Sequence, residues 1–109
     1  MHEVVVDGDA SIGGVAALLR RLEAVAEGAP GTRFLLDETG FRAFAIGPRE
    51  MREIAAAWRA NTHLPRARVA VLAPSPVIYG LNRMAISLGD AENVRVFRTR
   101  AEAEAWLTL

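Results

Sequence analysis

Hydrophobic positions along this chain fall into short continuous runs separated by longer stretches with helical spacing. Residues 68–73 (RVAVLA) form a short run, and apolar residues then recur at helical spacing over residues 77–88. Residues 94–97 form the next short run, and a final helix is expected from Thr99 to about Leu107. Strands that alternate with helices in this order predict an α/β fold with a mainly parallel sheet and right-handed crossovers.

The earlier part of the chain continues this alternation. Residues 4–6 (VVV) form a continuous apolar strand, which we expect to be covered on both faces. A helix is expected from an N-cap at Ser11 to about Glu27, and residues 33–37 (RFLLD) form a second strand. We therefore expect one domain over residues 1–109, with about four mostly parallel strands whose order the pattern leaves open.

Helix ends are marked by local residue choices in the second half of the chain. Pro48 is a favoured first-turn residue, and Ser75 followed by Pro76 predicts an N-cap with proline at the first helical position. Gly89 is expected to end that helix. Thr99 with a glutamate three residues later predicts a capping box.

Residues 41–46 (FRAFAI) are the least regular segment. Their alternation leaves no polar face, so we interpret them as a loop packed over the core or as the lining or lid of a cavity. Trp58 has an inward position on the helical stripe that follows from Pro48, and a void beside it is what this second interpretation requires.

Composition limits the classes of function. The chain has 109 residues and no net charge, which gives no electrostatic support for a nucleic-acid partner or an anionic membrane. Its basic residues are all Arg, and there is no Cys for a disulfide, thiol chemistry or a thiolate metal site. No apolar run approaches membrane-spanning length, so we expect a cytoplasmic protein without a cofactor.

The C-terminal forty or so residues carry a family resemblance. Residues 93–97 (NVRVF) followed by residues 101–107 (AEAEAWL) are similar to the closing signature of SpoIIAA-like, STAS-related bacterial domains, and residues 79–84 (YGLNRM) resemble their middle. The resemblance implies an α/β sandwich with helices largely on one sheet face. It also implies protein or small-ligand binding rather than catalysis, and the related CRAL-TRIO fold holds apolar ligands.

One departure from that family bears on regulation. Anti-sigma-factor antagonists of the STAS class carry a phosphorylatable Ser in an Asp-Ser turn, and Ala45-Ile46 stands at that place here. The phosphorylation switch is therefore not transferred to this chain.

The first candidate site is the turn before the helix at residues 76–89. Ser75, Tyr79, Asn82 and Arg83 lie there, where a helix N-terminus with free N–H groups is expected at the carboxyl end of a strand. Such a place suits a carboxylate or phosphate. Capping alone also explains Ser75, and Arg83 can simply stack on Tyr79.

A second candidate is a group of acids at the ends of the first two strands, Asp7, Asp9, Asp37 and Glu38. If those strands are neighbours, the acids would cluster and could hold a divalent cation or raise one another's pKa. Turn chemistry is the simpler interpretation, because nothing else in the chain completes a metal site. His2 and His63 lack paired spacing and are expected to be solvated.

These observations lead to two hypotheses. The first is a non-enzymatic STAS-like regulatory or interaction module with an unknown protein partner, which we expect to act as a homodimer. The second is a protein that binds a small apolar or anionic ligand in a pocket near residues 41–46 and 75–83. A weaker third, a hydrolase or isomerase, would need the acidic cluster.

Overall fold

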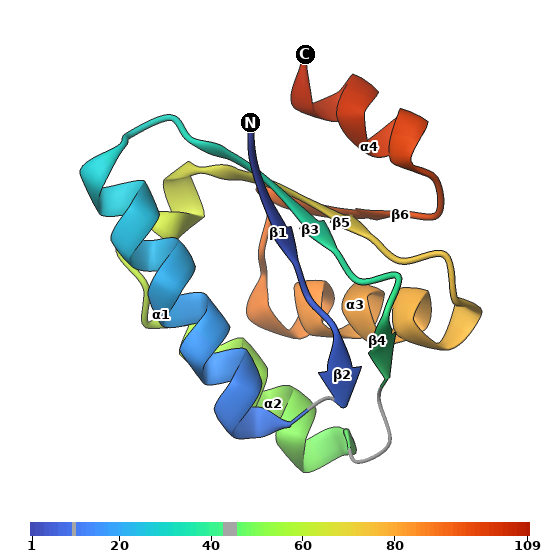
Figure 1. Cartoon of the computed structure of the whole chain (residues 1–109). Coiled ribbons are helices and arrows are strands. Elements are labelled where there is room, and N and C mark those ends of the chain that lie inside the picture. The colour runs from blue at the N-terminus through green and yellow to red at the C-terminus, as the bar shows by residue number, and fades with distance from the viewer. Residues whose placement is uncertain (10, 43–45) are drawn as a thin grey trace.

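The computed structural model describes residues 1–9, 11–42 and 46–109. These residues form one α/β domain in which a four-stranded parallel sheet lies between two layers of helices (Figure 1). The strands of this sheet are β1 (His2–Val5), β3 (Arg33–Asp37), β5 (Arg68–Leu72) and β6 (Val94–Phe97). The helices are α1 (Ile12–Gly28), α2 (Pro48–Arg59), α3 (Pro76–Gly89) and α4 (Arg100–Leu107). The remaining elements are the short strands β2 (Gly8–Asp9) and β4 (Phe41–Arg42) and the short 3₁₀ helix η1 (Leu64–Arg66).

The strands of the sheet follow one another in chain order, β1-β3-β5-β6, and all of them are parallel. Because each crossover steps in the same direction along the sheet, crossovers of one hand place all the connecting helices on one face. Figure 1 shows α1, α2 and α3 together on that side and α4 alone on the other. The strands β2 and β4 form a separate parallel pair beyond the ends of β1 and β3.

The two faces of the sheet carry separate hydrophobic clusters. The cluster between the sheet and α1–α3 contains Phe34 and Val71. The smaller cluster, between the sheet and α4, contains Leu35 and Ala70 from the sheet and Leu107 from α4. The central strand β5 is therefore buried on both faces, which explains its continuous apolar run.

The expectation for the first strand was wrong. β1 is an edge strand, and α4 packs on β3, β5 and β6. Val4 faces the α1–α3 side and is buried, whereas Val5 faces the opposite side and is 63% exposed. Apolar residues at consecutive positions do not show that both faces are covered when the strand lies at the edge of the sheet.

The helix caps are confirmed in part. The Ser11 hydroxyl accepts a hydrogen bond from the Gly14 backbone nitrogen at 3.0 Å, and the Thr99 hydroxyl accepts one from Glu102 at 3.3 Å. Ser75 precedes α3 as predicted, but its side chain makes no cap hydrogen bond. The left-handed residue that ends α3 is Asp90 (φ 53°), one position after the expected Gly89.

Candidate functional site: an apolar cavity beneath helices α1, α2 and α3

A cavity of about 370 Å³ lies between the sheet and the layer formed by α1, α2 and α3. Small-molecule sites in proteins commonly enclose ~300–1,000 Å³. The lining is mainly apolar and comes from the sheet, from all three helices and from the residues on either side of positions 43–45. Among the residues that line it are Val4, Leu18, Leu22, Leu36, Phe41, Ile46, Met51, Trp58, Val69, Val71, Ile78, Leu81, Ala85 and Val94.

Small side chains help to leave this space open. Ala17 on α1 and Ala85 on α3 belong to the lining, where larger side chains would fill the volume between helix and sheet. The cavity also reaches the surface beside α1, because the lining includes the exposed residues Ser11 and Arg21. A small molecule therefore has a path into the space.

Glu38 brings a carboxyl group to this apolar lining. It follows β3 directly, and its side chain is 8% exposed. The carboxyl atom Oε1 accepts a hydrogen bond from Nδ2 of Asn82 on α3 at 2.7 Å. Its backbone N–H donates to the carbonyl of Leu72 at 2.9 Å, which fixes the turn against the neighbouring strand.

Burial changes the protonation chemistry of this carboxyl group. Loss of water around Glu38 raises its pKa from the ordinary value of 4.5 to about 7, against the lowering effect of the hydrogen bond from Asn82. The group is therefore partly protonated near neutral pH and can exchange a proton with the contents of the cavity.

Asp37 and Glu38, two of the acids proposed as a cluster, lie on opposite faces of the sheet, and the side chain of Asp9 lies outside the described part of the chain. β1 and β3 are neighbours, as that hypothesis required, but consecutive side chains of a strand point to opposite faces. Asp37 lies on the α4 side, within 3.5 Å of Arg100, while Glu38 points to the cavity. Hydrogen bonds from Thr39 lower the pKa of Asp37. Over residues 1–9, 11–42 and 46–109, the structure contains no group of His, Cys, Asp and Glu side chains able to hold a metal ion.

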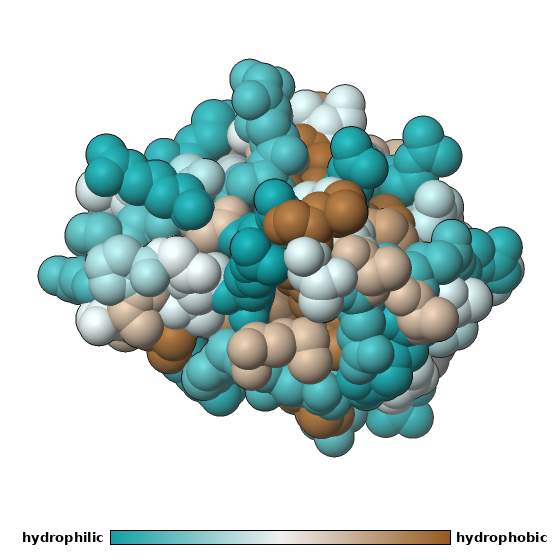
Figure 2. All heavy atoms as spheres, turned by 90° about the horizontal axis from the view of Figure 1, so that it is seen from above, coloured by the Kyte–Doolittle hydropathy of each residue, from teal (hydrophilic) through white to brown (hydrophobic). Residues whose placement is uncertain are grey.

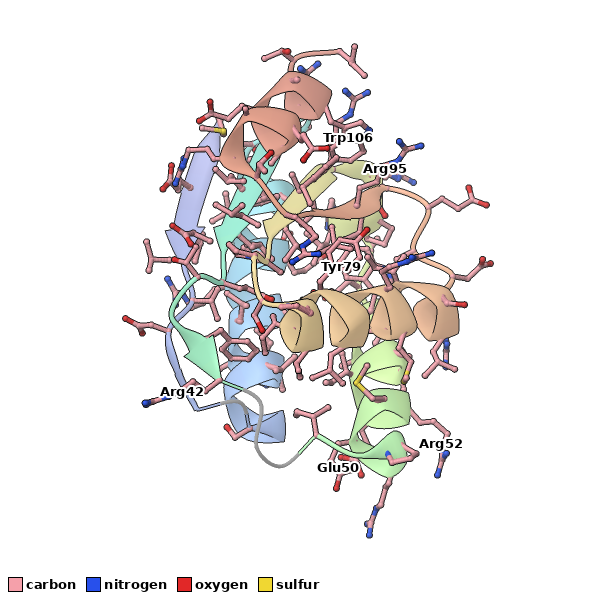
Figure 3. The ribbon with its side chains drawn as sticks, turned by 90° about the vertical axis from the view of Figure 1, so that its right-hand side faces the viewer. Arg42, Glu50, Arg52, Tyr79, Arg95 and Trp106 are labelled. Carbon is pink, nitrogen blue, oxygen red and sulfur yellow. The ribbon has the colours of Figure 1, made fainter. Side chains whose placement is uncertain are left out.

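The residues predicted around the start of α3 point in different directions. Asn82 lines the cavity, whereas Ser75 and Arg83 are exposed. Tyr79 packs partly against the core on the sheet side of α3 (Figure 3), and the guanidinium groups of Arg83 and Arg98 each lie 5.9 Å from its ring centre. The structure thus separates Asn82 from the exposed part of the predicted site.

The cavity includes Trp58 and the two described ends of the irregular segment at residues 41–46. Phe41 and Ile46 line the cavity, and so does Trp58, so a void does lie beside Trp58. Residues 43–45 lie outside the described part of the chain. Whether the segment 41–46 as a whole lines a ligand pocket therefore stays a prediction.

Sequence reasoning missed the special position of Glu38, although a signal was present. Phe34, Leu36 and Glu38 alternate along one face of the strand and its extension, so period-two spacing directs Glu38 toward the helices that cover Phe34. It also missed a partner for His63, whose Nδ1 lies 3.4 Å from a carboxylate oxygen of Glu23.

The opposite side of the sheet has a different character. The guanidinium groups of Arg68 and Arg95 lie 5.1 and 5.8 Å from the ring centre of Trp106, and Figure 3 shows Arg95 beside that ring. Arg68 also donates to the Trp106 carbonyl at 2.9 Å, which satisfies the end of α4. Seen from the end of the molecule nearest α4, hydrophilic side chains predominate, with smaller apolar areas between them (Figure 2).

Comparison with protein families, with curated proteins and with solved structures finds no match to this chain. Among the helices of the described residues, none has the length and apolar character needed to cross a membrane. The geometry of the cavity is therefore the observation from which a function is proposed.

Proposed function

We propose that this protein is a non-catalytic STAS-like module that binds a small apolar molecule in the cavity beneath α1, α2 and α3. The observation that carries this proposal is an apolar space of about 370 Å³ with one buried polar pair, Glu38 and Asn82, at its wall. Apolar lining with few placed polar groups is the usual composition of small-molecule sites.

The STAS-like assignment is supported by the placement of the helices. The resemblance implies helices largely on one sheet face, and three of the four helices of this domain lie on one face. The non-catalytic assignment is supported by the separation of Asp37 from Glu38. Asp37 pairs with Arg100, and Glu38 accepts a hydrogen bond from an amide group rather than facing a second acid.

The two tryptophans allow a direct test with decanol as the probe. Trp58 lines the cavity, whereas Trp106 belongs to α4 and packs against the hydrophobic cluster on the other face of the sheet. We expect decanol to change the fluorescence of a Trp106→Phe variant, in which Trp58 is the only tryptophan, and to leave a Trp58→Phe variant unchanged. A change in the Trp58→Phe variant alone would contradict the proposal.

A cavity-filling substitution provides the matched control. Ala85→Leu adds side-chain volume to the cavity lining, so we expect a folded protein that no longer responds to decanol. Ala105→Leu makes the same change at an exposed position of α4 and should leave the response intact. Equal responses from both variants would show that decanol binds elsewhere.

An interaction role is the second candidate function. Val77, Met84 and Leu88 are 64, 51 and 44% exposed on α3, and their spacing places them on one side of the helix. A second copy of this chain, as in the expected homodimer, would bury the same residues from both partners. Sedimentation should then show a dimer that Met84→Glu dissociates, and a monomeric parent protein would refute this role.

A further inference from the structure

The orientation of the Asn82 amide is fixed by its two acceptors. Nδ2 donates to Oε1 of Glu38 at 2.7 Å and to the backbone carbonyl of Ile78 at 2.9 Å. A backbone carbonyl can only accept, so the amide nitrogen, not the oxygen, must face Ile78. Both N–H bonds of the amide are then used within the protein.

Two oxygen atoms of the pair remain without a donor. Among the described residues, neither Oδ1 of Asn82 nor Oε2 of Glu38 accepts a hydrogen bond. Neither atom is an enclosed unsatisfied group, so each keeps some accessible surface. Both residues line the cavity, and the pair therefore offers acceptors, with no spare amide donor, to a molecule bound there.

The two free oxygen atoms of Glu38 and Asn82 determine which polar group a bound molecule can carry. When Glu38 is ionised, a carboxylate or phosphate would meet a second carboxylate, which repels it, and an amide oxygen, which cannot donate to it. The other charged residues of the lining, Asp7 and Arg21, are exposed and belong to the side of the cavity that reaches the surface. A hydrogen-bond donor, in contrast, would pair with these oxygens: an ammonium group has enough N–H bonds for both, and an alcohol has one O–H bond for one of them.

We propose that the molecule bound in this cavity is apolar with a single hydrogen-bond-donating head, either an amine, which donates to Oε2 of Glu38 and to Oδ1 of Asn82, or an alcohol, which donates to one of these two oxygens. This inference rests on the proposed function, and it replaces the anionic alternative considered for the ligand. The buried state of Glu38, which raises its pKa to about 7, agrees with it because a donor or a cation compensates for the lost water.

The test uses four probes of equal chain length: decanol, decylamine, decyl methyl ether and decanoate. Binding is measured by Trp58 fluorescence in the Trp106→Phe protein at about pH 8, where most of the Glu38 carboxyl is ionised. We expect decanol and decylamine to bind about tenfold more tightly than the ether, and decanoate to bind most weakly. Glu38→Gln should weaken decylamine by about tenfold and decanol by less, because the amide keeps an acceptor but loses the charge.

The outcomes separate this inference from the function on which it rests. Equal affinities for all four probes, or tightest binding of decanoate, would overturn the donor-head inference and leave the apolar cavity as a binding site. No binding of any probe would refute the proposed function itself. Decylamine binding that persists in Ala85→Leu would place the amine outside the cavity and would also overturn the inference.

Discussion

Substitution of Glu38 by glutamine should remove a specific pH dependence of stability. The pKa of Glu38 is raised by burial from 4.5 to about 7 in the folded protein, whereas in the unfolded chain it returns to the ordinary value. Between these two values the folded protein binds more protons than the unfolded chain. Its free energy of unfolding therefore falls as pH rises through this interval.

The size of the effect follows from the shift. A change of roughly two and a half pKa units, at about 1.4 kcal/mol per unit, corresponds to about 3 kcal/mol. This contribution is fully present below about pH 4.5 and is lost by the time the pH has passed about 7. The pKa values of Glu3, Glu23 and Asp37 are lowered, so these groups stay ionised across this interval and their stabilising contributions are lost only at lower pH.

Urea denaturation at several pH values between about 5 and 8 measures this dependence. The parent protein should lose stability across the interval, and Glu38→Gln should lose about 3 kcal/mol less, since glutamine has no proton to release. Glu27→Gln, an exposed change on α1, should behave like the parent protein. Parallel curves for the parent and Glu38→Gln would refute the assignment of this pH dependence to the buried carboxyl group.

Three further substitutions test individual contacts. Asn82→Ala removes the hydrogen bond that lowers the pKa of Glu38, so ¹³C NMR of the carboxyl carbon should show that pKa rising further; an unchanged titration would contradict the contact. Glu23→Ala removes the carboxylate that accepts the backbone N–H groups of residues 62–64 at 2.6–3.3 Å, and we expect a loss of about 1–3 kcal/mol in denaturation, against little change in Glu27→Ala. Thr99→Ala should cost about 1 kcal/mol by removing the α4 cap, and Thr99→Ser should restore it; equal stability of the two variants would show that the hydroxyl is not needed.

The sequence was sufficient to predict elements whose signals are local. The apolar run predicted at residues 68–73 forms β5 (Arg68–Leu72), whose strand character is visible in its own residues. The Thr99 hydroxyl accepts a hydrogen bond from the Glu102 backbone nitrogen and donates one to the Glu102 carboxylate, and both contacts join residues only three positions apart. The cover of β1 depends on how far α4 extends across the sheet, which no local pattern encodes. The Ser75 hydroxyl is a similar case, since a suitable residue at an N-cap position need not make the cap hydrogen bond.

The candidate site was only partly accessible from the sequence. The irregular segment at residues 41–46 and the inward Trp58 indicated a pocket, and the cavity does include Phe41, Ile46 and Trp58. The pairing of Glu38 with Asn82 joins the end of β3 to the middle of α3, residues 44 positions apart. Only the tertiary packing of α3 against the sheet brings these two side chains together.

Methyl NMR with decanol tests the central claim most directly, because both faces of the sheet are observed in one experiment. We predict that decanol shifts the methyl signals of Leu18, Val71 and Ala85, which line the cavity, while those of Ala103 and Leu107, on the sheet-facing side of α4, stay unchanged. Shifts confined to Ala103 and Leu107, or no shifts at saturating decanol, would contradict a ligand site between the sheet and α1, α2 and α3.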